Sequence, residues 1–228
     1  WDLETDVLVV GFGAAGACAA IEARQAGARV RVLEVASAGG GSASWSGGEV
    51  YVGGSGGTSV QRDRGTRARL VAANAAAQKF YAEQLRSPEA QIARDYLTER
   101  NFDGQAALTF GCGYAPAGWD TMTKALLSQG FDFKELEAAG LSKQGRQGPI
   151  DRFHRRLLWP IKNLGGDVIG FGARKLFDDD NLGKYMNTPE TMLYKKSQVL
   201  FGLDHAKKNI AKGHQVVIVE GYTDVMAM

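Results

Sequence analysis

The stretch RRLLWPIKNLGGDVIGFGARKL, residues 155–176, contains two runs of apolar and β-branched residues joined by Leu164, Gly165 and Gly166. Runs of this kind favour β-strands, and a short glycine-containing connection between them is typical of a β-hairpin. The sequence therefore predicts that residues 155–163 and 167–176 form two paired strands.

Basic side chains gather in this hairpin and on both sides of it. Nine of them fall between residues 152 and 196: Arg152, Arg155, Arg156, Lys162, Arg174, Lys175, Lys184, Lys195 and Lys196. Such a cluster can neutralise the phosphates of a nucleic-acid backbone with little reading of the bases. Without further motifs, a solvated hairpin face with scattered lysines is the better interpretation.

Four stretches supply those further motifs, and they carry a family resemblance: FGCGYAPAGWDTMTKAL (110–126), DRFHRRLLWPIKNLGGDVIGFGARKL (151–176), KYMNTPETMLYKK (184–196) and VVIVEGYTDVMAM (216–228). In order and spacing they resemble the catalytic core of bacterial DNA primases. The resemblance implies a mixed α/β N-terminal subdomain over residues 59–212 and DNA-dependent synthesis of RNA primers. It also implies a single-stranded DNA template and nucleotides as partners.

The same resemblance implies roles for individual basic residues. In the primase family, basic residues at the positions of Arg174, Lys184 and Lys195 lie on a ridge that grips template and nucleotide phosphates. Arg152, Arg156 and Lys196 are further candidates for nucleic-acid and nucleotide binding. One position departs from the pattern, since Thr109 stands where the family often has a basic residue.

The stretch 216–228 predicts a buried strand that delivers Glu220 to its end, then a turn and a helix that carries Asp224. This layout resembles the start of a Toprim domain, assigned to residues 213–228. The resemblance implies that Glu220 and Asp224 are catalytic and that Glu220 belongs to a Mg²⁺ site. The Asp-x-Asp pair of that domain does not occur after Asp224, and we expect an incomplete site, a strand on an unsupported edge and no primer synthesis.

Other parts of the primase family are not recognisable in the sequence. We find neither a cysteine and histidine cluster typical of a zinc ribbon nor a helicase-binding helical domain, so the replicative helicase is not expected as a partner. The acidic run at residues 178–180 is expected to be a loop without a role in metal binding.

The first 58 residues have a different character. TDVLVVGFGAAGACAAIEARQAGARVRVLEVA (residues 5–36) predicts a strand, a glycine-rich turn, a helix to about Gly27 and a second strand that ends at Glu34. The glycines at positions 11, 13 and 16 fit a Rossmann-like βαβ unit. They allow a tight turn, the approach of a diphosphate and close helix packing, while the carboxylate of Glu34 can hold ribose hydroxyls.

The continuation ASAGGGSASWSGGEVYVGG (36–54) resembles the flavin-binding loop of FAD-dependent dehydrogenases of the fumarate reductase and 3-ketosteroid dehydrogenase group. The resemblance implies cofactor-binding roles, in addition to those of Gly11, Gly13, Gly16 and Glu34, for Gly41, Ser42, Gly47 and Gly48. A flexible glycine-serine linker is the alternative. The resemblance ends near Gly57, so we expect weak FAD binding or none, and an FAD-dependent oxidoreductase is the second functional hypothesis.

Composition supports a chain of mixed origin. Residues 1–58 hold 13 of the 30 glycines and none of the lysines. The chain as a whole carries 27 basic and 25 acidic residues. With 44% hydrophobic residues in 228, the sequence is typical of a globular protein. No apolar run reaches the roughly 20 residues of a membrane span. We therefore expect a cytoplasmic primase fragment fused to a partial FAD-binding segment, with no membrane partner.

Overall fold

The structure is a computed structural model in which residues 4–11, 14–33, 60–213 and 215–228 are described. It divides into two compact units, one formed by Trp1–Gly57 together with His205–Met228 and the other by Thr58–Asp204. From the sequence we expected three domains, 1–58, 59–212 and 213–228, which assign the two ends of the chain to different domains.

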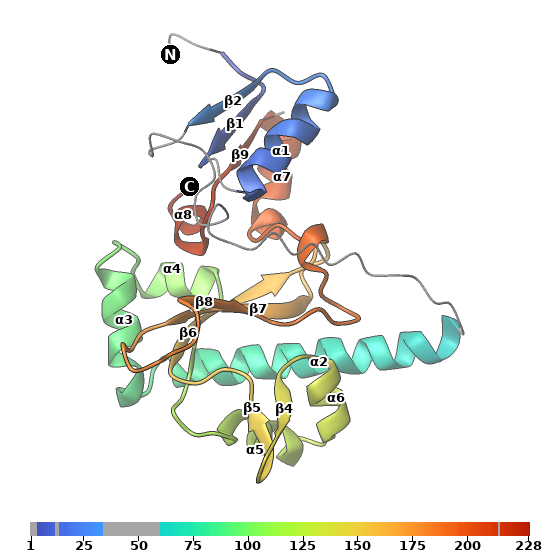
Figure 1. Cartoon of the computed structure of the whole chain (residues 1–228), viewed down its shortest axis with the longest axis vertical. Coiled ribbons are helices and arrows are strands. Elements are labelled where there is room, and N and C mark those ends of the chain that lie inside the picture. Colours follow the sequence, from blue (N-terminus) through green and yellow to red (C-terminus); the bar gives the residue numbers. More distant parts are fainter. Residues whose placement is uncertain (1–3, 12–13, 34–59, 214) are drawn as a thin grey trace. The chain divides into compact units, whose positions relative to one another are not determined.

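The unit 58–204 is built around a long helix and an antiparallel sheet (Figure 1). Its helices are α2 (Val60–Gln84), η2 (Pro88–Ala90), α3 (Gln91–Thr98), α4 (Gly104–Thr109), α5 (Thr121–Ser128), α6 (Phe133–Ala138) and η3 (Lys196–Gln198). Its strands are β3 (Gly113–Ala115), β4 (Ser142–Gly145), β5 (Gly148–Asp151), β6 (Arg156–Lys162), β7 (Val168–Lys175) and β8 (Tyr185–Asn187). The mixed α/β fold expected for a primase core is confirmed.

The four-stranded sheet has the order β3-β6-β7-β8, and all its neighbours are antiparallel. The predicted hairpin forms its centre, with Arg156 opposite Lys175 and Trp159 opposite Gly172. A hydrogen bond of 3.0 Å from the Asn163 N–H to the carbonyl of Asp167 closes its turn. Six successive residues of each hairpin strand are buried, so the hairpin lies in the core of this unit.

Helix α2 packs against this sheet and also contacts α5 and α6. In Figure 1 the helix lies between the sheet and the group formed by α5, α6 and the β4-β5 hairpin. A Cβ atom placed on Gly113 would lie 2.6 Å from the Cβ of Tyr81, so only glycine lets β3 approach the helix this closely. The Tyr81 ring meets Phe171 edge to face, with 5.5 Å between the ring centres.

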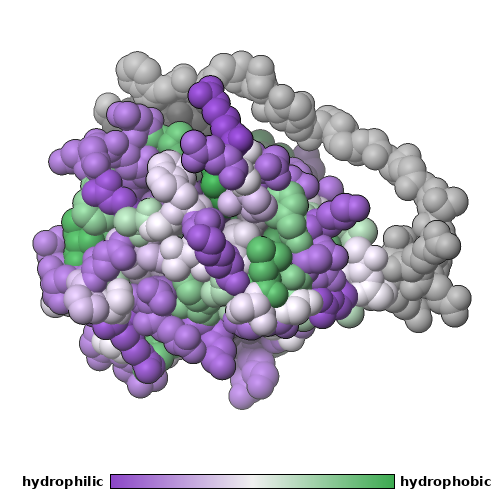
Figure 2. All heavy atoms as spheres, turned by 90° about the horizontal axis from the view of Figure 1, so that it is seen from below, coloured by the Kyte–Doolittle hydropathy of each residue, from purple (hydrophilic) through white to green (hydrophobic). Residues whose placement is uncertain are grey.

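Polar groups fix the ends of the short helices. Buried Asp151 at the end of β5 accepts hydrogen bonds from the backbone N–H groups of Met122 (2.9 Å) and Thr123 (2.8 Å), which satisfies the start of α5. Asp132 and Glu135 form a reciprocal capping box at α6. The face on the side of β4, β5, α5 and α6 is mostly hydrophilic, with separate hydrophobic patches (Figure 2).

The other unit contains a parallel sheet of order β2-β1-β9. Its elements are β1 (Val7–Val10), α1 (Ala14–Gln25), β2 (Val30–Leu33), β9 (Val216–Ile218) and α8 (Tyr222–Ala227), and α7 (Leu203–Gly213) leads into it. We expected β9 to lie on an unsupported edge; it does lie at an edge of this sheet, but one of its sides is paired with β1. The backbone groups of β9 pair with those of β1, which would otherwise be exposed at the edge of a two-stranded sheet.

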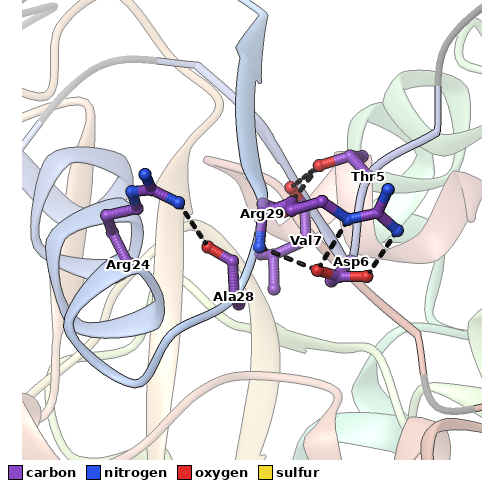
Figure 3. Close-up of polar contacts among 6 residues, drawn as sticks. All are labelled: Thr5, Asp6, Val7, Arg24, Ala28 and Arg29. Atoms are coloured by element: carbon purple, nitrogen blue, oxygen red, sulfur yellow. Dashed lines mark hydrogen bonds and ion pairs between the residues drawn. The ribbon is translucent and has the colours of Figure 1, made fainter.

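Hydrogen bonds join the residues just before β1 to Arg29, the residue just before β2 (Figure 3). The Arg29 guanidinium donates to both carboxylate oxygens of Asp6, at 3.1 and 2.9 Å, and the Arg29 backbone N–H donates to Asp6 at 2.8 Å. The Thr5 hydroxyl donates to the carbonyl of Arg29 at 2.6 Å. The hydrogen bonds from Arg29 lower the pKa of Asp6 to about 2, so this carboxylate is ionised at neutral pH and fixes the register of the two strands.

Within the described residues, none of the helices combines the length and the apolar character that a membrane span needs.

Candidate nucleic-acid interface

Arg174 lies near the end of β7, and two aromatic side chains define its surroundings. Its guanidinium carbon is 4.0 Å from the centre of the Tyr96 ring, and its Nη1 donates to the carbonyl of Lys175 at 2.9 Å. Across the sheet it is paired with Tyr185 of β8, a residue that is 45% exposed. Arg174 is therefore held in place by Tyr96, while its cross-strand neighbour Tyr185 lies at the surface.

The ring of Tyr96 in α3 also contacts a second cation, the guanidinium of Arg100. The guanidinium carbon of Arg100 is 3.7 Å from the centre of the same ring. Cations attract the electron-rich faces of aromatic rings, and each such contact is worth roughly 0.5–2 kcal/mol. Burial raises the pKa of Tyr96, and the two arginines oppose this rise. Tyr96, which is buried, thus lies beneath this surface and Arg100 is exposed beside it, although neither was among the residues selected from the sequence.

Three of the predicted lysines are exposed on the same part of the chain. The carbonyl of Lys184, just before β8, accepts a hydrogen bond of 2.9 Å from the Lys175 N–H. Lys195 Nζ lies 3.8 Å from Glu190 Oε2, with both side chains about half exposed, and Lys196 donates its backbone N–H to Glu190 at 2.8 Å. Such an exposed ion pair is weak, so Lys195 is available to a phosphate.

Arg156 has a different environment from the one that phosphate binding requires. Its side chain is only 1% exposed, its Nη2 is 2.5 Å from Asp180, and its Nη1 donates to the carbonyl of Gly183 at 3.0 Å. Neighbouring Arg155 pairs with Asp179 at 2.7 Å. The acidic run 178–180 therefore neutralises two arginines, and Arg156 supports the loop between β7 and β8 instead of offering its charge to solvent.

Arg152 is half-buried and follows β5 directly. Its backbone N–H donates to the carbonyl of Leu141 at 2.9 Å, and its Nε is buried without a hydrogen-bond partner among the described residues. The structure therefore places Lys184, Lys195 and Lys196 on exposed surface and Arg152 and Arg174 at half-buried positions, whereas Arg156 is buried.

Of the expected metal residues, Glu220 lies between β9 and α8, and Asp224 lies in the first turn of α8. Asp224 Oδ2 accepts a hydrogen bond of 2.9 Å from the Gly221 N–H, so it caps α8. No group of three histidine, cysteine or acidic side chains that could hold a metal ion occurs in the part of the chain that the structure describes. Mg²⁺ usually takes one or two carboxylates together with waters and substrate phosphates, so Glu220 and Asp224 by themselves supply at most part of a site.

Two of the expected flavin-binding residues lie in the described structure. Gly11 has a φ of +93°, which favours glycine, and a Cβ atom on Gly16 would lie 2.1 Å from the carbonyl oxygen of Gly11. Both glycines are therefore needed for the turn between β1 and α1. The remaining expected cofactor residues lie outside the described residues: Gly13, Glu34, Gly41, Ser42, Gly47 and Gly48.

The family model of the DNA primase catalytic core, N-terminal domain, matches residues 80–207, and the chain belongs to the DNA primase family. The DNA primase of Mycolicibacterium smegmatis is 73% identical over 176 residues, which are 77% of this chain and 28% of that protein. The DNA primase of Streptomyces coelicolor is 58% identical over 173 residues, 75% of this chain and 27% of that protein. The chain thus spans little more than a quarter of the length of these relatives.

A second family model, FAD dependent oxidoreductase, matches residues 6–130. It overlaps the primase model over residues 80–130. The match to the M. smegmatis primase covers 176 of the 228 residues, so it must include this overlap. The chain is a composite, in which primase sequence follows a segment similar to flavoproteins.

Solved structures agree with this assignment. The RNA polymerase domain of Mycobacterium tuberculosis primase DnaG has a TM-score of 0.70 and 69% identity, covering 71% of this chain and 53% of that chain. A DnaG primase catalytic domain bound to single-stranded DNA has a TM-score of 0.65 and 35% identity, covering 72% of this chain and 51% of that one. The M. tuberculosis domain is also known in complex with a DNA duplex that has a 6-nucleotide overhang.

Proposed function

We propose that residues 58–204 form the template-binding part of a bacterial DNA primase, and that a single DNA strand lies along β7 and β8. The observation that carries this proposal is the position of Arg174, which is held against Tyr96 and paired across the sheet with exposed Tyr185. A cation beside an exposed aromatic ring, here that of Tyr185, suits a single strand, because phosphates meet the charge and an unstacked base meets the ring.

Lys184 and Lys195 extend this surface, which we call the template surface and define as Arg174, Lys184, Lys195 and Lys196. Its charges contact phosphates, so binding is expected to depend on salt and little on base sequence. The solved complexes of related primase domains with DNA support this assignment.

For the protein to which this surface belongs, we propose DNA-dependent synthesis of RNA primers in the cytoplasm, with nucleotides as substrates. Mg²⁺ supplies charge neutralisation in phosphoryl transfer when it is bound. Because Glu220 and Asp224 do not form a ligand set here, we assign no catalytic step to these 228 residues. We further infer that β9 and α8 begin a Toprim domain and that β1, α1 and β2 begin a Rossmann-type unit.

The binding proposal is tested with a fluorescein-labelled single-stranded oligonucleotide of mixed sequence, by fluorescence anisotropy at low salt. The triple variant Arg174→Ala/Lys184→Ala/Lys195→Ala should bind at least about tenfold more weakly than the parent, because three phosphate contacts are lost. Equal affinity of this variant and the parent would contradict the proposal.

A matched variant controls for net charge. Lys134→Ala/Lys143→Ala/Arg146→Ala removes the same residue types from exposed positions on α6, β4 and the β4-β5 turn. These elements lie on the other side of α2 from the sheet (Figure 1). We expect the control to change the affinity by no more than about twofold, since it leaves the template surface intact.

An FAD-dependent oxidoreductase remains the second candidate, favoured by the match of residues 6–130 to that family. An absorbance spectrum of the purified chain distinguishes the two. A flavin band near about 450 nm in stoichiometric amount would favour the second candidate, whereas its absence is expected for the template-binding protein.

A further inference from the structure

We propose that Glu220 prevents the glycine turn after β1 from binding a dinucleotide diphosphate such as that of FAD. The proposal starts from the pairing of β1 with β9, in which Val7 lies opposite Val216 and Val9 opposite Ile218. Continued by two residues, this register aligns Gly11 with Glu220. The two residues are brought together by strands that lie more than two hundred positions apart in the sequence.

Glu220 lies close beside Gly11. A Cβ atom built on Gly11 would lie 3.5 Å from Glu220 Oε2 and 3.6 Å from the Glu220 Cβ. The carboxylate therefore lies in van der Waals range of the space beside the turn. In dinucleotide-binding βαβ units, this is where glycine leaves room for the diphosphate to approach the backbone.

The negative charge of Glu220, in addition to its volume, opposes binding of the diphosphate. The part of the chain that the structure describes shows no ion pair to Glu220. An ionised carboxylate and a diphosphate brought into contact repel each other, and like charges placed together at an interface strongly disfavour binding.

Gly11 and Gly16 both meet what a nucleotide-binding turn needs. Gly11 adopts a φ of +93°, and the close approach of Gly16 to the Gly11 carbonyl is the packing that these units require. The obstacle comes from Glu220, which follows β9 in the Toprim-like stretch, and not from Gly11 or Gly16. FAD therefore does not fit this unit as it is built.

The test is a titration of the 228-residue chain with ADP, the diphosphate half of FAD, by isothermal calorimetry, and with FAD by quenching of flavin fluorescence. Glu220→Gln removes the charge at nearly constant volume, and Glu220→Ala removes both charge and volume. Both variants should bind ADP at least about tenfold more tightly than the parent, with Glu220→Ala the tighter of the two.

Glu22→Gln is the matched control, because it removes one exposed carboxylate from α1 and changes the net charge by the same amount. It should bind ADP as the parent does. Thermal unfolding of each variant verifies that it is folded, and Glu220→Ala and Glu220→Gln test the same contact independently.

Three results would overturn the proposal: equal ADP affinity of the parent and both Glu220 variants, stoichiometric FAD on the parent, or no ADP binding by any of the proteins. The last would mean that something other than Glu220 excludes the diphosphate. Oligonucleotide binding should be unchanged in all variants, so failure of the template-binding proposal would be seen separately.

Discussion

The guanidinium of Arg174 rests on the ring of Tyr96, with 4.0 Å from its central carbon to the ring centre. Arg174 comes from a strand and Tyr96 from a helix, so the contact joins the sheet to α3 at the surface where we place the template. A side chain that is already ordered loses less conformational entropy when it binds a phosphate. The ring thus positions the cation before the ligand arrives.

Replacing Tyr96 tests this positioning role. Tyr96→Phe keeps the ring and should bind the oligonucleotide within about twofold of the parent, whereas Tyr96→Leu should bind about three- to tenfold more weakly because both cation contacts are lost. Anisotropy at fixed low salt gives the affinities, and urea unfolding verifies that each variant is folded. If Tyr96→Leu binds as tightly as Tyr96→Phe, the ring does not position Arg174.

The Arg156–Asp180 pair is expected to stabilise the fold and not to bind the template. Arg156→Met leaves Asp180 without its partner in a largely buried site, and loss of one member of such a pair costs about 3–5 kcal/mol in the free energy of unfolding. Urea denaturation measures this loss. Where the variant is still folded, its oligonucleotide affinity should equal that of the parent.

A control for this pair is Asp178→Asn, at an exposed position of the same acidic run. It should change the free energy of unfolding by less than about 0.5 kcal/mol. A stable Arg156→Met variant with weakened DNA binding would return Arg156 to the template surface.

The pH dependence of stability should report the pair between Arg69 and Glu135, which joins α2 to α6 at 2.6 Å. The hydrogen bonds from Arg69 lower the pKa of Glu135 to about 2, below its usual 4.5. Because the folded state binds this proton less well, ionised Glu135 stabilises the fold above about pH 4.5. Its contribution is lost as the pH falls towards about 2.

Compared with the parent, Glu135→Gln should therefore lower the free energy of unfolding by about 1 kcal/mol or less at pH 6, and this difference should shrink between pH 5 and pH 2. Urea unfolding at several pH values provides the measurement. Glu137→Gln, which removes a charge from the same helix without touching Arg69, is the control. The same pH trend in both variants would contradict a specific role for the pair.

Local features of the sequence could predict the hairpin and the first βαβ unit. Residues 155–163 and 167–176 were expected to be strands and form β6 (Arg156–Lys162) and β7 (Val168–Lys175). Strand and turn preferences depend on neighbouring residues, so such elements can be recognised within a short window.

The contacts between distant residues could not be predicted in this way. Arg155 and Arg156 are identical in type and adjacent, yet only Arg156 is buried: Arg156 begins β6, whereas Arg155 lies just before the strand with a φ of +50°. Tyr96 has the sequence pattern of an ordinary core residue on α3, and its contact with Arg174 depends on how α3 meets β7. The pairing of β9 with β1 joins segments that resemble different families, which no local pattern indicates.

The salt dependence of oligonucleotide binding tests the template surface most directly. For single strands, the slope of log K against log salt concentration is about −0.7 for each phosphate neutralised. Loss of three contacts in Arg174→Ala/Lys184→Ala/Lys195→Ala should therefore make the slope shallower by about 2 than in the parent. The matched variant Lys134→Ala/Lys143→Ala/Arg146→Ala should retain the parent's slope. Equal slopes for the parent and the template-surface variant would show that these three side chains do not contact the phosphates.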